Sequence, residues 1–146
     1  MEPPNTGEGA LSAERSIALA VAARDVWSLI GDFAGLDRWM PGILAIDTAG
    51  EGVGTVRTVR TRAGVFVERL EASGPMWQRY AILTGPLPVQ KYYATLLVTE
   101  TSDVSCRVDW TSRFDAGVGV SPRTAVAAVE AVHAAGFRAL TRLFAS

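Results

Sequence analysis

The chain has 146 residues with a net charge of −1, and 49 % of them are hydrophobic. This length suits one domain, and the composition supplies a core and argues against global disorder. Acidic and basic residues are interspersed, so the sequence does not indicate nucleic-acid binding, and no apolar stretch is long enough to insert into a membrane. The single cysteine, Cys106, is typical of a reducing compartment, and a cytoplasmic location is expected. Lys91 is the only lysine beside many arginines, alanines and glycines, a composition typical of GC-rich bacterial genomes.

The first elements follow a leader. Residues 1–14 contain proline, glycine and asparagine without periodicity and are predicted to be mobile, so the folded domain is expected over 15–146. Ile17, Leu19 and Val21 alternate with small residues as in a strand. A short helix is predicted over 22–30, closed by Gly31, and a second helical turn over 36–39.

Six further strands are predicted, each bounded by turn residues. Their connections are too short for parallel crossovers, so neighbouring strands should be antiparallel. The predicted ranges are 43–47, 53–61, 65–73, 77–84, 92–100 and 104–115.

After the last predicted strand, the spacing of the apolar residues changes to that of a helix. Ser121 is a suitable N-cap, and Pro122 suits the first helical position. Apolar residues recur at steps of three and four, which predicts one long amphipathic helix. These positions are Val126, Val129, His133, Phe137, Leu140 and Phe144.

One helix lying flat cannot cover so large a sheet, so the sheet should curl around it and enclose a pocket. The alternative that side chains fill this space stays open.

Alternation along the strands predicts which residues point inward. In the last strand the inward set is Cys106, Val108, Trp110, Ser112 and Phe114. The same test turns Tyr92, Ala94, Leu96 and Val98 inward.

One charged pair is predicted on the inward face. Glu68 shares a face with Phe66 and Leu70, and a tight turn at 63–64 sets Arg57 opposite Glu68 or one diagonal step away. A buried pair of this kind can be a structural ion pair, a rim pair reaching solvent, or a functional pair. In the functional interpretation Glu68 moves protons, and Arg57 binds an oxyanion or steadies the carboxylate.

A series of short motifs is spread along the chain. They are Val26-Trp27, Gly31-Asp32-Phe33, Trp39-Met40-Pro41, Gly54-Thr55-Val56-Arg57, Val67-Glu68-Arg69-Leu70, Gly85-Pro86-Leu87-Pro88-Val89 with Tyr92, and Val108-Asp109-Trp110. In their order and spacing, from about Arg15 to Phe144, they resemble the polyketide cyclase/dehydrase-like branch of the START/Bet v1 superfamily. This resemblance implies an α+β helix-grip fold, a curved seven-stranded antiparallel sheet around a long C-terminal helix, with two short helices after the first strand. Within the branch, the chain is similar to the lachrymatory factor synthase group, whose pocket uses an arginine, a glutamate, tyrosines and a tryptophan.

The resemblance adds roles to five residues, because Arg57, Glu68, Tyr80, Tyr92 and Trp110 stand where the pocket residues of that group are expected. Arg57 and Glu68 are the candidate catalytic residues, and Tyr80, Tyr92 and Trp110 are candidate substrate contacts. Four further candidate contacts come from the predicted inward faces: Phe66, Leu96, His133 and Phe137. For His133, a core histidine is the favoured alternative. The mouth of the pocket is expected at 31–42 with the loop 85–88. One histidine and one cysteine do not suffice for a zinc site, and neither a metal nor a cofactor is expected.

Three functions are carried forward. The first is a cofactor-free cyclase, dehydratase or isomerase of bacterial secondary metabolism acting on a small hydrophobic or polyketide-like molecule. The second is a non-catalytic carrier or sensor of a hydrophobic ligand. The third is a partner-binding module in which the pocket is vestigial. The sequence leaves a homodimer open and does not identify the substrate.

Overall fold

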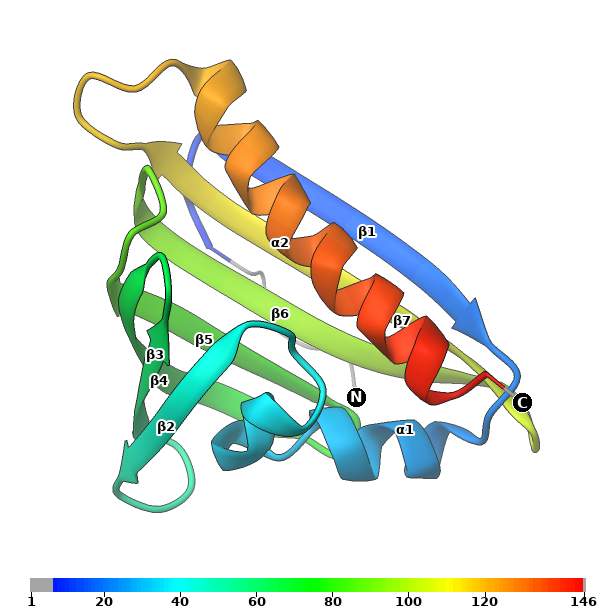
Figure 1. Ribbon diagram of the computed structural model, residues 1–146. Helices are drawn as coiled ribbons and strands as arrows, with labels where there is room; N and C mark the ends of the chain where they lie inside the picture. The colour runs from blue at the N-terminus through cyan, green and yellow to red at the C-terminus, as the bar shows by residue number, and fades with distance from the viewer. Residues whose placement is uncertain (1–6, 146) are drawn as a thin grey trace.

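A curved antiparallel sheet holds one long helix in its concave face (Figure 1). The computed structural model describes residues 7–145. The sheet has seven strands in the order β1-β7-β6-β5-β4-β3-β2. In chain order the elements are β1 (Leu11–Leu19), α1 (Ala23–Ile30), the 3-10 helix η1 (Phe33–Arg38), β2 (Ile43–Ala49), β3 (Val56–Thr61), β4 (Gly64–Gly74), β5 (Trp77–Thr84), β6 (Val89–Ser102), β7 (Ser105–Ala116) and α2 (Pro122–Leu143). The predicted helix-grip architecture is confirmed.

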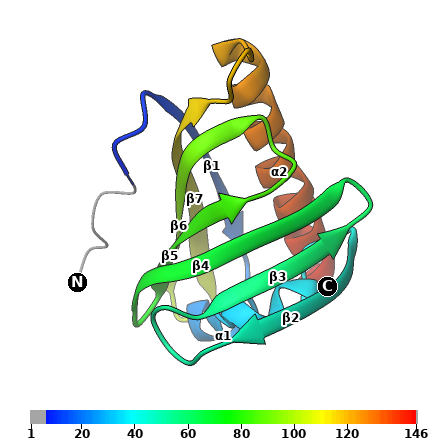
Figure 2. The same ribbon diagram turned by 90° about the vertical axis from the view of Figure 1, so that its left-hand side faces the viewer.

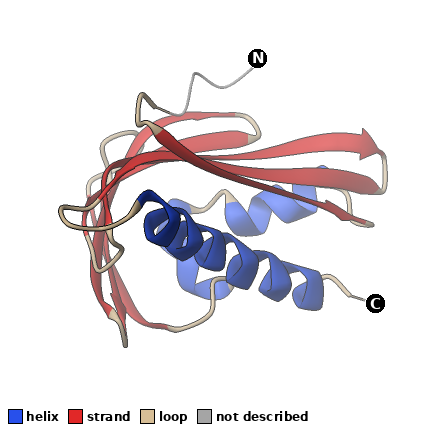
Figure 3. Ribbon diagram, turned by 90° about the horizontal axis from the view of Figure 1, so that it is seen from above, coloured by secondary structure: helices blue, strands red, loops and turns tan. Residues whose placement is uncertain are grey.

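The sheet bends so that its two halves flank the helices (Figure 3). The strand pairing shifts register between Val67 and Glu68, and again between Leu70 and Ala72, along β4. Such irregularities bend a strand and increase its twist, which turns the β2–β4 part of the sheet toward α2.

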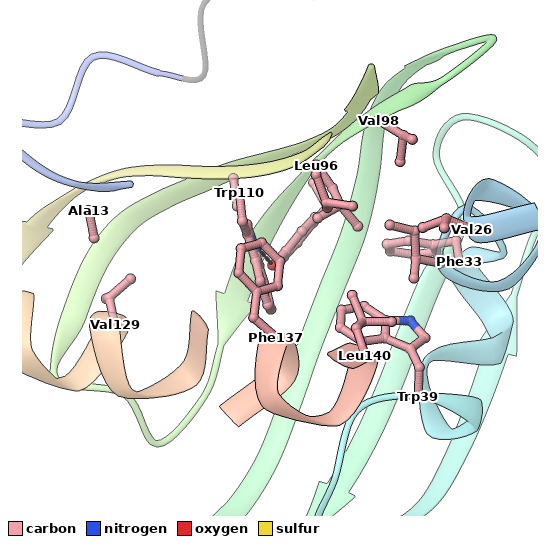
Figure 4. Close-up of a cluster of buried hydrophobic side chains, with 14 of the residues drawn as sticks. Ala13, Val26, Phe33, Trp39, Leu96, Val98, Trp110, Val129, Phe137 and Leu140 are labelled. Atoms are coloured by element: carbon pink, nitrogen blue, oxygen red, sulfur yellow. Dashed lines mark hydrogen bonds between the residues drawn. The ribbon is translucent and has the colours of Figure 1, made fainter. Parts of the chain in front are cut away.

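Helix α2 begins as predicted. Ser121 has extended backbone angles and accepts a hydrogen bond from the backbone N–H of Thr124, and Pro122 follows at the first helical position. Its apolar face contributes Val129, Phe137 and Leu140 to the core. Figure 4 shows Phe137 and Leu140 beside Trp110 and Trp39, between the helix and the sheet.

Four predicted boundaries are wrong by three residues or more. β1 starts at Leu11, not Arg15, because its first residues pair with the end of β7 from Leu11↔Phe114 onward. The predicted leader 1–14 therefore ends earlier, and its first six residues lie outside the described part. β3 starts at Val56, not Val53, because Gly52 and Gly54 adopt positive φ angles in a loop. β6 extends back to Val89, and the second short helix starts at Phe33.

The inward faces were predicted well. Cys106, Val108, Trp110, Ser112 and Phe114 are all buried, as are the four inward positions assigned to β6. Among the described residues, no helix is long and apolar enough to cross a membrane.

Candidate functional site

A pocket of about 350 Å³ opens between η1, the start of β2, the β3–β4 hairpin and α2. This volume is at the lower end of the range for small-molecule sites. Its walls are apolar: Leu36, Met40, Ile43, Val59, Phe66 and Val132. Arg57, Glu68, Tyr80 and Trp110 are its inner polar and aromatic residues, and Pro41, Gly42, Thr61, Arg62 and Ala63 complete the lining.

Arg57 and Glu68 form an ion pair on the pocket wall. They lie directly opposite each other on β3 and β4, which is one of the two placements that the sequence left open. Oε1 of Glu68 lies 2.8 Å from Nε and 2.7 Å from Nη2 of Arg57. The Arg57 side chain is only 3 % exposed and that of Glu68 only 9 %, so bulk water screens this pair little. Within the described chain, Oε2 of Glu68 accepts no hydrogen bond, and this oxygen is the carboxylate atom available to a ligand.

Arg57 also fastens η1 to the sheet. Its Nη1 donates to the backbone carbonyl of Phe33 over 2.9 Å. The guanidinium carbon lies 3.9 Å from the centre of the Phe33 ring and 5.1 Å from that of Tyr80. Cation–π contacts of this kind add to the hydrogen bonds where the site is desolvated. Each of the three guanidinium nitrogens therefore has a partner, and these contacts connect Arg57 to Glu68 and to η1.

Tyr80 and Trp110 form the second polar group of the pocket. The indole Nε1 of Trp110 donates to the hydroxyl oxygen of Tyr80 over 3.2 Å. Burial raises the pKa of Tyr80 well above its ordinary value, and the charges of Tyr92 and Glu68 raise it further. Tyr80 therefore stays a neutral phenol, whose own proton can be donated to an oxygen acceptor.

A buried hydrogen-bonded chain lies behind the pocket. The hydroxyl of Tyr92 lies 2.7 Å from Oγ of Ser112, which lies 2.9 Å from Nε2 of His133. The imidazole stacks on Trp110 with ring centres 4.6 Å apart. Burial, with a smaller contribution from the charge of Arg15, lowers the pKa of His133 to about 4. His133 is therefore a neutral core histidine that supports Trp110 from behind.

The structure separates the predicted site residues into two groups. Arg57, Phe66, Glu68, Tyr80 and Trp110 line the pocket. Tyr92, Leu96, His133 and Phe137 are buried in the layer behind it and are absent from its lining. The mouth of the pocket also differs from the prediction. The β3–β4 turn lines the pocket, and the loop 85–88 does not.

Sequence reasoning missed several pocket residues. Val59, Arg62 and Val132 line the pocket although the sequence indicated no role for them there, whereas Leu36 and Met40 fall within the predicted mouth at 31–42. The carbonyl of Phe33 was missed because a backbone acceptor carries no residue-type signal. In the described part of the chain, no group of three or more His, Cys, Asp or Glu side chains is placed to hold a metal ion.

Comparisons with known proteins agree with this geometry. An uncharacterised protein from Bacillus thuringiensis is 30 % identical, with a TM-score of 0.84 over 92 % of this chain and 98 % of that chain. A protein from Thermobifida fusca is 32 % identical, with a TM-score of 0.76 over 91 % of this chain and 92 % of that chain. The Zhui aromatase/cyclase from Streptomyces shares the fold at 16 % identity, with a TM-score of 0.68 over 91 % of this chain and 95 % of that chain.

The search of curated proteins found no match. The family comparison covers nearly the whole described chain, because residues 10–145 match the family described as polyketide cyclase/dehydrase and lipid transport. The finer likeness to the lachrymatory factor synthase group stays a prediction. The curved sheet around a C-terminal helix, the apolar pocket and this match together show that the chain belongs to the polyketide cyclase/dehydrase and lipid transport family.

Proposed function

We propose that this protein binds a small, partly apolar molecule and catalyses its cyclisation, dehydration or isomerisation without a cofactor. The observation that carries the proposal is that only one of the two carboxylate oxygens of Glu68 has a partner in the described chain. Arg57 holds one carboxylate oxygen, the other accepts no hydrogen bond in the described chain, and Glu68 lines an otherwise largely apolar pocket. A structural ion pair alone does not require a cavity beside its second oxygen.

The roles follow from the contacts. Glu68 takes a proton from the substrate through Oε2 and returns it at another atom, or gives it to a departing hydroxyl that leaves as water. Tyr80 donates a hydrogen bond to the substrate oxygen on which negative charge develops. Arg57 orients the carboxylate, and Trp110 offers an aromatic face to the substrate.

A carrier or sensor is the second candidate. The family description includes lipid transport, and most of the pocket wall is apolar. The aromatase/cyclase activity in the name of the Streptomyces protein supports the enzyme, with a polyketide-like substrate in bacterial secondary metabolism. The two candidates differ in whether Glu68 moves protons.

Proton exchange of a simple ketone separates them. In D2O, 2-tetralone exchanges its α-protons slowly, and NMR follows the loss of their signal. We expect the protein to accelerate this exchange and Glu68→Gln to lose about 10²-fold of that acceleration, because the amide cannot accept the proton. Glu71→Gln is the matched control, since Glu71 lies on the same strand and pairs with Arg69 outside the pocket. Binding of the ketone without any acceleration would favour the carrier.

Thermal melts of Glu68→Gln check the structural alternative. The glutamine carbonyl still accepts from Arg57, so we expect a loss of stability below about 2 kcal/mol. A loss of about 3–5 kcal/mol, as when a buried pair is broken, would show a structural ion pair and count against the catalytic assignment.

A further inference from the structure

The ligand of this pocket must match one charge that no residue of the described chain neutralises. We infer that the natural ligand is an amphipathic anion whose carboxylate binds Arg62, while its apolar body lies along the pocket. This inference rests on the proposed function of the pocket and names the chemical class of its ligand.

The pocket lining contains more positively than negatively charged side chains. Its charged side chains are Arg57, Arg62 and Glu68. Arg57 and Glu68 neutralise each other in the buried ion pair. Arg62 forms no ion pair or hydrogen bond with any residue in the range 7–145, so the lining carries an uncompensated positive charge.

The turn that carries Arg62 is rigid. Arg62 and Ala63 connect β3 to β4, directly beyond the paired residues Thr61↔Gly64. The hydroxyl of Thr61 donates to the carbonyl of Gly64 over 2.9 Å and accepts from the backbone N–H of Ala63 over 3.2 Å. Figure 2 shows this turn on the side of the sheet where β2 begins. The braced backbone holds the base of the Arg62 side chain at the pocket, and its exposed position there leaves the guanidinium free to meet a ligand.

The remaining polar groups restrict the ligand further. Both hydrogen-bonding functions of Thr61 are used inside the turn, so Arg62 is the polar side chain available beside the β3–β4 turn. A guanidinium matches the two oxygens of a carboxylate. Apolar walls separate the Arg62 end of the pocket from Glu68 and Tyr80. Glu68 and Tyr80 can form hydrogen bonds with a hydroxyl or carbonyl at the other end of the ligand.

Competition between two nearly isosteric compounds tests the inference. The uncharged dye N-phenyl-1-naphthylamine reports occupancy by fluorescence. It is displaced by 1-naphthaleneacetate or by 1-naphthaleneacetamide, which differ in charge but hardly in shape. We expect the carboxylate to compete about two- to fivefold better than the amide, the range for one partly exposed ion pair. In Arg62→Gln this preference should fall to about one, because glutamine carries no charge.

Two variants serve as controls. Arg60→Gln removes an exposed arginine from the same hairpin outside the lining and should leave the preference intact. Val132→Phe adds volume to the pocket wall and should weaken the dye and both competitors together. If the dye fails to bind, or Val132→Phe leaves its affinity unchanged, the proposed pocket function fails and this inference with it. If the dye binds in the pocket but acid and amide compete equally, or the preference survives in Arg62→Gln, only the inference about the anion is overturned.

Discussion

Arg57 makes several different contacts in this site. A single guanidinium donates to the carboxylate and to the carbonyl of Phe33, and it contacts two aromatic rings. Arg57 therefore connects the sheet to η1, which contributes Leu36 to the pocket wall. A lysine has no planar fork and cannot reproduce this set of contacts.

His133 makes the stability of the protein depend on pH. Its pKa is about 4 in the folded protein, against 6.5 for the ordinary side chain. The unfolded chain therefore binds a proton between these values that the native protein does not, and acid favours unfolding. The stabilisation is complete above pH 6.5 and is lost as the pH falls toward 4, by about 3 kcal/mol in all.

Denaturant titrations of the wild type and His133→Gln at several pH values measure this effect. Glutamine can still bond to Ser112 but does not titrate, and the carboxylates common to both proteins cancel in the difference. We expect the stability advantage of the wild type to shrink from pH 7 to pH 4.5. Parallel pH curves would show that His133 is protonated equally in both states.

At the scale of the element, α2 is placed by close contacts on one face. Gly136 lies in the middle of this helix, where glycine is normally unfavourable. A Cβ there would come within 2.8 Å of the Trp110 ring and 3.1 Å of the Trp39 ring, so the missing side chain lets both tryptophans approach the helix. The next residue, Phe137, packs against Trp110 with ring centres 5.8 Å apart.

Phe137→Ala should be among the most destabilising substitutions. The side chain is buried in the main core, and truncating a buried phenylalanine costs about 3–5 kcal/mol. Chemical denaturation measures the loss, and Arg138→Ala, at the neighbouring exposed position, should cost less than about 0.5 kcal/mol. A loss below about 1 kcal/mol for Phe137→Ala would mean that the core relaxes around the missing ring.

At the scale of the whole molecule, Gly9 and Ala10, which precede β1, belong to the fold. The carbonyl of Gly9 accepts hydrogen bonds from Nε and Nη2 of Arg113, and the N–H of Ala10 donates to Asp115. Gly9 is also packed so closely that a Cβ would lie 2.4 Å from the backbone nitrogen of Phe114. These contacts differ from the mobile leader that the composition predicted.

Two truncations and one substitution measure this contribution. Deleting residues 1–10 should lower the melting temperature by several degrees, because Arg113 and Asp115 lose these partners. Deleting residues 1–6 removes none of the contacts described above and should change the melting temperature much less. Gly9→Ala should resemble the longer deletion, because the Phe114 backbone cannot move aside. Equal melting temperatures for all of these proteins would restore the prediction of a dispensable leader.

Local patterns determined much of this protein from the sequence alone. Alternation along a strand depends only on the chain itself, so the inward faces of β6 and β7 could be assigned. A tight turn restricts the register of its hairpin, so Arg57 could be placed opposite Glu68 or one diagonal step away. The N-cap at Ser121 and the helical period determined α2 in the same way.

Only the tertiary structure decided which inward residues meet the cavity. That depends on where the sheet bends and on how η1 and α2 lie across it, and these positions result from contacts between residues far apart in the chain. Tyr92 and Phe137 point inward as predicted, yet they are covered by the layer that includes Tyr80 and Trp110. The backbone carbonyl of Phe33 and the position of Arg62 at the pocket likewise follow from the packing of η1 and the β3–β4 turn around the same space.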